Sequence, residues 1–156
     1  MIAVLQRVLQ AKVEVDGGVV GQIGPGILAL VAITQDDTAE DVSWMANKLA
    51  SIRMFRSADG EKHFELDVRE IKGEILLVSQ FTLAAQTKKG RRPSFEKAAP
   101  PEMGRKLFDD LVRAVQGLNI PTQTGQFAAD MKISLINDGP VTFIVESRSS
   151  AAPSSA

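Results

Sequence analysis

Residues 27–33 read ILALVAI, an unbroken run of apolar side chains. A strand with one solvated face alternates apolar and polar residues, whereas a strand covered on both faces is apolar throughout. Gly24, Pro25 and Gly26 directly precede this run and separate it from the element before it. The stretch therefore predicts a central strand in a sheet that is covered on both faces.

Further strands are predicted on both sides of this one. Residues 2–8 and 11–15 alternate as strands do, and residues 16–18 supply turn chemistry before residues 19–23, so we expect a hairpin there. The remaining predicted strands span residues 74–83, 121–127, 131–136 and 141–146. Residues 61–72 have no pattern that assigns them to a helix or a strand.

The sequence NDGP, residues 137–140, separates the last two predicted strands. Asn and Asp followed by Gly favour a hairpin turn, so we expect these two strands to form a hairpin. Pro140 then stands where the returning strand begins, and it removes a backbone donor from the first pairing position. A simple hairpin gains nothing from this proline.

Two helices are predicted from apolar residues at helical spacing. The first begins near Thr38 and ends before Ser57, with an apolar stripe of Val42, Met45, Leu49 and Ile52. The second opens at Pro100 and Pro101 and ends near Gly117, with a stripe of Met103, Leu107, Leu111, Val115 and Leu118.

The order of these elements is strands, helix, strand, helix, strands. It predicts an α/β fold, with helices on one side of a mixed sheet and a second sheet layer that houses the terminal hairpins. We expect residues 1–146 to form one domain. Residues 147–156 have the composition of a flexible tail, and we expect no function there.

Composition excludes several classes of protein. The 156 residues are 44% hydrophobic and 24% charged, as in ordinary globular proteins, and there is no cysteine for a disulfide, a thiolate nucleophile or a cysteine-based zinc site. The N-terminus does not read as a secretion signal, so we expect a cytoplasmic protein with no membrane partner. The net charge of −1 restricts any contact with a polyanion to a local patch.

The usual equipment of hydrolases is missing from the sequence. The one histidine, His63, lies in a charged, turn-like setting and is interpreted as a surface residue. It has no second histidine to share a metal, and the chain has no Gly-x-Ser-x-Gly motif. We therefore expect neither a metal nor another cofactor.

A polar loop over residues 84–92 follows the strand predicted at 74–83 and concentrates positive charge. Lys88, Lys89, Arg91 and Arg92 flank Gly90 in an otherwise weakly acidic chain. Such a run is usually a solvated loop. Its place beside a polar strand end favours a second interpretation, in which it contacts the phosphates of a bound RNA.

Ser79, Gln80 and Thr82 interrupt an apolar strand with polar side chains, alongside Phe81. The simplest interpretation is an ordinary strand end. In the functional interpretation, alternation places Gln80 and Thr82 on one face and Ser79 and Phe81 on the other, and the strand end forms the floor of a pocket.

Two of these stretches together resemble the paired signatures of the D-aminoacyl-tRNA deacylases. They are SQFTL, residues 79–83, and NDGPVT, residues 137–142. Other stretches with the family's order and spacing are residues 6–8, 15–17, 23–26, 89–95 and 129–131, so the resemblance covers residues 1 to about 146. It implies a three-layer α/β/β fold, a homodimer with active sites at the subunit interface, and a cis peptide between Gly139 and Pro140.

The resemblance also implies an activity, the hydrolysis of D-amino acids from tRNA. The carbonyls of Gly139 and Pro140 would enter the neighbouring subunit's site, hold the substrate's α-amino group and exclude L side chains. Glycine has no side chain to exclude, so the family's removal of glycine from tRNA(Ala) is implied as a second activity. Met131 is expected to bind substrate, and Arg7 to brace Gly139 and Pro140.

The mechanism is open between two routes. Thr82 is the candidate nucleophile by residue type, but a threonine hydroxyl needs a base and the sequence offers none nearby. The resemblance favours the other route, in which the RNA's 2′-hydroxyl helps to activate water. The N–H groups of Phe81 and Thr82 would then stabilise the oxyanion, and Gln80 would line the site.

Phe81 would shape the site, and the resemblance implies that a phenylalanine here marks the D-specific branch. Ser79, the first residue of the same motif, completes the expected catalytic segment. Two rival functions remain. One is a non-catalytic tRNA-binding module that keeps the basic loop. The other is a hydrolase of other small acyl esters, in which the basic loop is only solvent-facing charge. DNA is not an expected partner.

Overall fold

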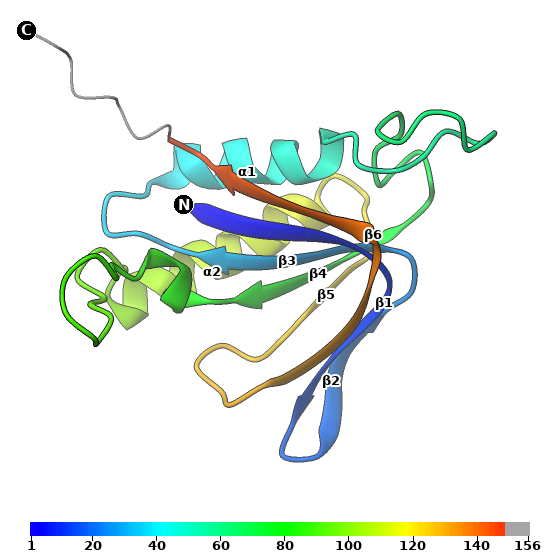
Figure 1. The fold of residues 1–156 in the computed structure, drawn as a ribbon. Coiled ribbons are helices and arrows are strands. Elements are labelled where there is room, and N and C mark those ends of the chain that lie inside the picture. Colours follow the sequence, from blue (N-terminus) through cyan, green and yellow to red (C-terminus); the bar gives the residue numbers. More distant parts are fainter. Residues whose placement is uncertain (149–156) are drawn as a thin grey trace, which may run out of the picture.

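The structure is a computed structural model that describes residues 1–148. Its elements in chain order are β1 (Ile2–Val15), β2 (Gly18–Ile23), β3 (Gly26–Ala32), α1 (Ala39–Ser51), β4 (Glu74–Ser79), the 3₁₀ helix η1 (Phe81–Ala84), α2 (Pro101–Gln116), β5 (Thr122–Thr124) and β6 (Lys132–Glu146). The strands form one sheet in the order β2-β1-β3-β4-β5, with β6 beside β1 (Figure 1).

Strand β3 lies at the centre of this sheet, as its apolar run predicts. It is antiparallel to β1 on one side and parallel to β4 on the other. A Cβ atom on Gly26 would lie 1.9 Å from the backbone oxygen of Glu74, so only glycine lets β4 approach this closely. The prediction of a mixed sheet is confirmed.

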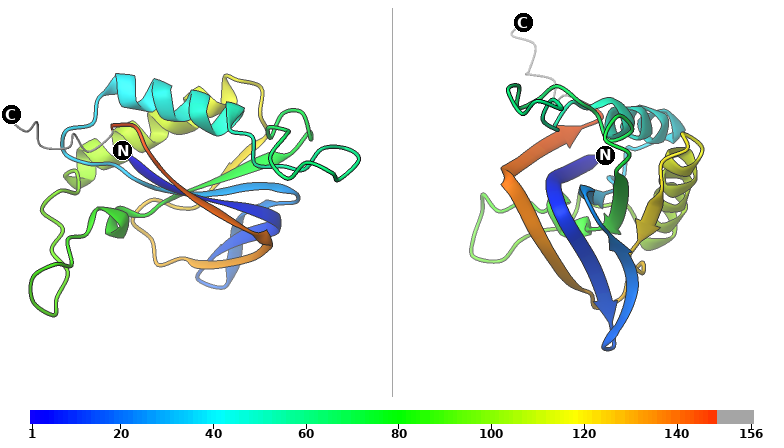
Figure 2. Two further views of the ribbon diagram at one scale, coloured as in Figure 1. Left: turned by 45° about the horizontal axis from the view of Figure 1, so that its top comes forward. Right: turned by 90° about the vertical axis from the view of Figure 1, so that its right-hand side faces the viewer.

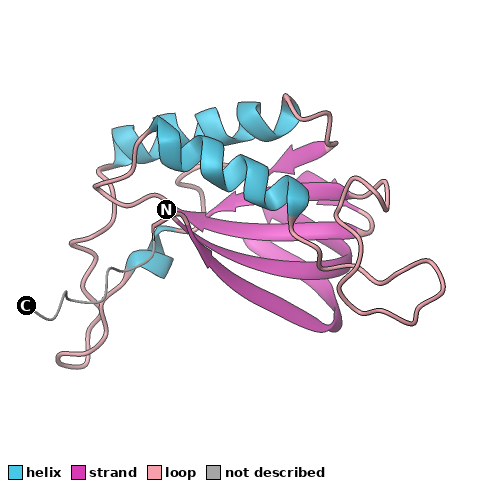
Figure 3. Cartoon of the chain, turned by 90° about the horizontal axis from the view of Figure 1, so that it is seen from above, coloured by secondary structure: helices cyan, strands magenta, loops and turns pink. Residues whose placement is uncertain are grey.

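The two faces of the central strands contribute to different cores. Ile27, Ala29 and Val31 pack with the helices, whereas Leu28 packs on the opposite face against residues of the curled part of the sheet. Both helices cover one face (Figure 3), and β1 and β6 bend together so that β2 and the lower half of β6 form the layer on the other face (Figures 1 and 2). The predicted α/β/β arrangement is confirmed.

Strand β6 corrects the hairpin predicted at its centre. The two runs on either side of residues 137–140 are one strand, antiparallel to β1 over its whole length, with Glu146 opposite Ile2 and Lys132 opposite Glu14. The register shifts near Val8, so residues 138–141 form a bulge instead of a turn. Residues that favour a hairpin turn also favour a bulge, so their presence does not distinguish the two. What decides is that β1 is long enough to pair with both runs.

Strand β4 is shorter than the sequence predicts. It ends at Ser79, the N–H of Gln80 donates to the carbonyl of Val31, and the chain then turns into η1. The predicted alternation of side chains through Thr82 is therefore wrong, because alternation requires an extended backbone. A strand propensity summed over SQFTL does not detect a helical turn of four residues.

The two helices confirm the predicted starts and most of the predicted stripes, although Ile52 and Leu118 lie just beyond the last residues of α1 and α2. Thr38 is the N-cap of α1, and its N–H donates to the Asp41 carboxylate at 2.8 Å. Pro101 begins α2, whose buried residues include Leu107, Leu111 and Val115. Neither helix is long and apolar enough to span a membrane, within the residues that the structure describes.

Two residues of the predicted tail make specific contacts. Ser147 donates to Asp41 at 2.6 Å, and the Arg148 guanidinium donates to both carboxylate oxygens, at 3.1 and 2.7 Å. These contacts join the end of β6 to the first turn of α1. Residues 149–156, the rest of the predicted tail, lie outside the described residues.

Candidate functional site

A cavity of about 590 Å³ lies where β3 and β4 end. Ligands of open α/β sheets generally bind beyond the carboxyl ends of parallel strands, and β3 and β4 are parallel neighbours in the sheet. The volume is within the usual range for small-molecule sites. The lining residues are Val31, Ile33, Ser79, Gln80, Phe81, Phe95, Ala98, Ala99, Pro101, Gly104, Phe127, Ala128, Ala129, Met131 and Ile133.

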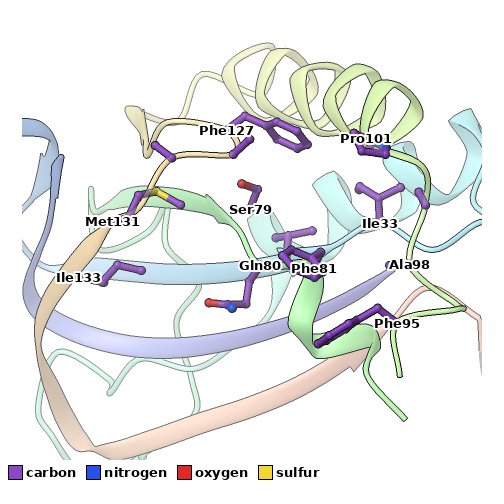
Figure 4. Close-up of a pocket in the computed structure, with 15 residues that line it drawn as sticks. Ile33, Ser79, Gln80, Phe81, Phe95, Ala98, Pro101, Phe127, Met131 and Ile133 are labelled. Carbon is purple, nitrogen blue, oxygen red and sulfur yellow. The ribbon is translucent and has the colours of Figure 1, made fainter. Parts of the chain in front are cut away.

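Four of the residues expected in the site line this cavity together: Ser79, Gln80, Phe81 and Met131. Figure 4 shows Ser79 between Phe127 and Phe81, with its hydroxyl turned toward the side of the cavity where Met131 lies. Thr82 is not among the lining residues. Its hydroxyl accepts a hydrogen bond from the Gln80 amide, which is not a base.

The backbone of η1 supplies donors beside the cavity. The first N–H groups of a helical turn have no acceptor within that turn. Those of Phe81 and Thr82 meet this condition, and neither has a hydrogen-bond acceptor in the part of the chain that the structure describes. Adjacent free N–H groups are the kind of donor that stabilises an oxyanion.

Among the described residues, the lining of the cavity carries no charged side chain. Its mouth is aromatic: Phe81 is 59% exposed and meets Phe95 edge-on, with ring centroids 5.1 Å apart. Phe127 forms part of the wall beside α2 (Figure 4). A surface of this kind favours a neutral, flat group such as a nucleobase over a phosphate.

Sequence reasoning missed Phe95 and Phe127 as site residues. Each lies in an irregular, polar segment, where a large aromatic side chain has no strand or helix to pack it. An aromatic residue isolated among polar neighbours is a weak signal of a binding wall. The α2 residue Gly104, also in the wall, carries no signal that the sequence makes visible.

The bulge in β6 presents the other predicted motif. The Gly139-Pro140 peptide is cis, as the resemblance implies, and both residues are exposed. Gly139 has φ +139°, a conformation that favours glycine. Asn137 fastens the bulge internally, because its side-chain oxygen accepts the N–H of Val141 at 2.8 Å and its amide donates to the Thr142 hydroxyl at 2.8 Å.

Arg7 connects this bulge to the rest of the fold. The residue is 2% exposed. Its Nε donates to the carbonyl of Asp138 at 2.9 Å, and another guanidinium nitrogen donates to the carbonyl of Met54 at 2.9 Å. The Asp138 carboxylate lies 3.5 Å from Nε. A buried guanidinium with these partners holds the backbone before Gly139 in one position.

The bulge and the cavity lie at different ends of β3. Arg7, beside the bulge, is opposite Ile27 at the start of β3, whereas Val31 and Ile33 line the cavity. At about 3.3 Å per residue, this separation is roughly 13–20 Å along the strand. Neither Gly139 nor Pro140 lines the cavity of its own chain.

The basic residues Lys88, Lys89, Arg91 and Arg92 lie on an exposed loop. A bridge between Gln86 and Ser94 closes its base, and Phe95 follows at the mouth of the cavity. The four charges therefore lie close along the chain to the mouth, without entering it.

His63 is exposed, and its Nδ1 lies 3.2 Å from an Arg56 guanidinium nitrogen. It does not line the cavity. Among residues 1–148 no three histidine, aspartate or glutamate side chains gather in a way that could hold a metal ion.

Comparison with known proteins gives consistent results. The family model described as D-Tyr-tRNA(Tyr) deacylase matches residues 4–146. The D-aminoacyl-tRNA deacylase of Geobacter sulfurreducens is 53% identical over 149 residues, covering 96% of this chain and 97% of its own. That of Methylococcus capsulatus is 57% identical over 145 residues, covering 93% and 94%.

Among solved structures, that of a protein named "c-Myc DNA Unwinding Element Binding Protein" superposes with a TM-score of 0.91 at 36% identity. The match covers 96% of this chain and all of the other. The three-layer arrangement described above is therefore shared over the full length of that protein.

Proposed function

The chain belongs to the D-Tyr-tRNA(Tyr) deacylase family, a family of hydrolases, and from this membership we propose that it cleaves the ester of D-aminoacyl-tRNA to free D-amino acid and tRNA. The observation that carries the proposal is the cavity itself, where Ser79, Gln80, Phe81 and Met131 meet in an uncharged wall. It accommodates the terminal nucleoside and places its aminoacyl ester beside η1.

The oxyanion of the hydrolysis is stabilised by the N–H groups of Phe81 and Thr82. Both are free donors on a turn whose start is fixed by the bond from Gln80 N–H to Val31. Donors that are already oriented cost little reorganisation when charge develops on the carbonyl oxygen, and removing one donor of this kind generally costs roughly 10²–10³ in rate. Ser79 and Gln80 line the site around the ester.

Water is activated through the 2′-hydroxyl of the RNA, not through Thr82. The Thr82 hydroxyl is engaged by an amide that cannot accept its proton, so among residues 1–148 it has no partner that would make it a nucleophile. The ester's own ribose carries a hydroxyl next to the scissile bond, and intramolecular groups at this distance act with a high effective concentration.

The substrate's chirality is read by the bulge of a second subunit. Within one chain the bulge is roughly 13–20 Å from the cavity along β3. In a homodimer, the exposed Gly139 and Pro140 of each chain enter the partner's cavity. There, their carbonyls accept hydrogen bonds from the substrate's α-amino group. With the amino group held in this way, a D side chain points to open space and an L side chain collides with the backbone.

This steric reading has a consequence for glycine. Because glycyl-tRNA has no side chain to collide, glycine mischarged on tRNA(Ala) is also hydrolysed. The exclusion is made of backbone and needs no matching side chain, so many D-amino acids are accepted. A phenylalanine at position 81 belongs to this D-specific arrangement.

The basic loop contacts the acceptor stem. Exposed Lys88, Lys89, Arg91 and Arg92 pair with phosphates, which carry no base identity and suit an enzyme that serves many tRNAs. We assign this activity to one domain over residues 1–146, in the cytoplasm, where aminoacyl-tRNA is used. The extent of the matched family supports these boundaries.

The test is hydrolysis of matched D-tyrosyl-tRNA and L-tyrosyl-tRNA by the purified protein. Loss of the D ester with the L ester intact is the expected result. Survival of both esters together with tRNA binding would favour a non-catalytic tRNA-binding module. Cleavage of both would contradict exclusion of L side chains by the bulge.

A further inference from the structure

Arg105 occupies an unusual position at the edge of the cavity. Its guanidinium carbon lies 4.7 Å from the centroid of the Phe127 ring, and Phe127 lines the cavity. The residue before it, Gly104, is buried and lines the same wall. We infer that Arg105 binds the phosphodiester next to the terminal nucleoside of the substrate; the inference rests on the function proposed above.

The other cations on this part of α2 are used differently. Lys106 pairs with Asp110 at 2.7 Å, and Arg113 pairs with the same carboxylate. Arg105 is exposed, and it has no carboxylate partner among residues 1–148 although Glu102 and Asp109 lie on the same helix. Its charge is therefore not neutralised by an ion pair on the helix and is available at the mouth of the cavity.

The cavity requires a cation at its edge and not in its interior. Its lining has no charged side chain in the described part of the chain, so a phosphate drawn inside would lose hydration without a partner. When the terminal nucleoside fills the cavity, its phosphodiester stays at the mouth, where the chain continues to the preceding nucleotide. A cation that lies against a lining residue is at the depth where this phosphate emerges.

Arginine over an aromatic ring is suited to this contact. The cation–π contact holds the guanidinium beside Phe127, and its N–H groups can still make a bidentate contact with a phosphate. Less side-chain freedom is lost on binding, because Phe127 already orients the group. Lysine at this position would keep the charge but lose the oriented fork.

The mouth then has positive charge on two sides. Phe95, which follows the basic loop of residues 88–92, forms one side, and Phe127 with Arg105 forms the other. The loop's residues are separated from the lining by the Gln86–Ser94 bridge, so they reach phosphates further along the RNA. Arg105 contacts the first phosphate, and the loop contacts later ones.

The experiment compares three esters of D-tyrosine: with intact tRNA, with the 3′-hydroxyl of adenosine 5′-phosphate, and with the 3′-hydroxyl of adenosine, which has no phosphate. Steady-state kcat and KM are measured for the wild-type protein, Arg105→Gln, Arg105→Lys and Lys106→Gln. Lys106→Gln is the matched control, because it removes a neighbouring exposed charge that is paired with Asp110. Circular dichroism melts verify that all four proteins are folded.

Arg105→Gln is expected to raise KM for the two phosphate-bearing esters by about threefold to fivefold, the scale of one exposed ionic contact, with kcat unchanged. The salt dependence of log KM for the tRNA ester should fall by about 0.7, the value for one phosphate contact on a single strand. The adenosine ester should be hydrolysed equally by both proteins. Arg105→Lys should recover part of the loss, and Lys106→Gln should match the wild type.

Two results would overturn the inference and leave the proposed function standing. One is unchanged KM for every ester in Arg105→Gln. The other is an equal loss on the adenosine ester, which would show that Arg105 acts only by orienting Phe127. A wild-type protein that hydrolyses none of the three D esters would overturn the proposed function, and the inference with it.

Discussion

Two segments of the molecule carry the family's motifs, and the structure treats them in opposite ways. Residues 79–81 line an open cavity, and the first N–H groups of η1 have no acceptor among the described residues. The bulge of residues 138–141 protrudes, with its backbone fastened by Arg7 and Asn137. One segment offers free donors to a ligand, and the other presents a fixed shape.

In the proposed function the two segments are complementary halves of one site. A segment that enters another protein's pocket must keep its shape without that pocket, and internal hydrogen bonds to a buried guanidinium achieve this. A segment that receives a substrate must leave donors unused until the substrate arrives. Since the two segments are roughly 13–20 Å apart along β3, we infer that they meet only between two chains.

The largest effect is expected from Gly139→Ala, which distorts the bulge of residues 138–141. An added Cβ would lie 2.7 Å from Val141 Cγ2 and 3.0 Å from its backbone nitrogen, at φ +139° where alanine is disfavoured. The bulge must shift, and a displacement of about 1 Å near reacting groups can cost on the order of 10² in rate. We expect a loss of this size in kcat/KM for D-tyrosyl-tRNA.

Gly24→Ala is the matched control, because a Cβ there meets no atom within 4 Å and the glycine has no positive φ. It should retain full activity. Suppose instead that Gly139→Ala and Gly24→Ala hydrolyse D-tyrosyl-tRNA equally and leave L-tyrosyl-tRNA intact. This result would show that the bulge is not part of the site.

A smaller effect is expected from Thr82→Ala, which alters η1 beside the cavity. The hydroxyl accepts a bond from the Gln80 amide but does no chemistry in the proposed mechanism, while the Thr82 N–H remains. Losing one ordinary hydrogen bond corresponds to roughly tenfold or less in kcat. Single-turnover hydrolysis with tRNA binding measured in parallel tests this, and loss of all turnover with binding intact would make Thr82 the nucleophile.

Asp41→Ala should lower the free energy of unfolding and leave activity unchanged. This variant therefore separates contacts that stabilise the fold from contacts that shape the site. Although burial raises the pKa of Asp41, hydrogen bonds from Arg148, Ser147 and the Thr38 N–H outweigh it and hold the pKa well below its ordinary value of 3.8. Losing the cap and these bonds should cost about 2 kcal/mol in the free energy of unfolding, measured by urea denaturation.

The pH dependence of this stabilisation follows from the lowered pKa. The contribution is fully present above about pH 4, where the unfolded aspartate is ionised, and it is lost as the pH falls toward the lower folded pKa. The stability difference between wild type and Asp41→Ala should therefore narrow below about pH 4. A constant difference down to pH 2 would contradict the assigned cause.

Sequence patterns predicted the layers of this fold better than its site. The apolar run of β3 and the stripes of the helices follow from burial, which the sequence records directly. The bulge did not follow, because NDGP satisfies the rules for a turn and the pairing of β6 with distant β1 decides otherwise. The end of β4 was missed for a related reason: η1 depends on one bond to Val31, a residue far away in the chain.

Within the site, motif residues were visible and wall residues were not. Ser79 and Gln80 stand out as polar positions at a strand end, and the roles of Phe81 and Met131 entered through the family resemblance. Phe127 and Gly104 reach the cavity only because α2 and the segment before β6 are brought together by the fold. Their role depends on tertiary placement, which no local pattern encodes.

The central claim, one site built from two chains, is tested most directly by complementation. Phe81→Asp places a carboxylate beside the developing oxyanion and should abolish activity, whereas Gly139→Ala should lower activity by about 10² through the bulge. In a mixture of the two impaired variants, a dimer with one chain of each has one intact site, because the pocket of one chain meets the bulge of the other. Random pairing should restore about a quarter of the wild-type rate on D-tyrosyl-tRNA. No recovered activity in a mixture where tagged heterodimers are isolated would contradict the claim.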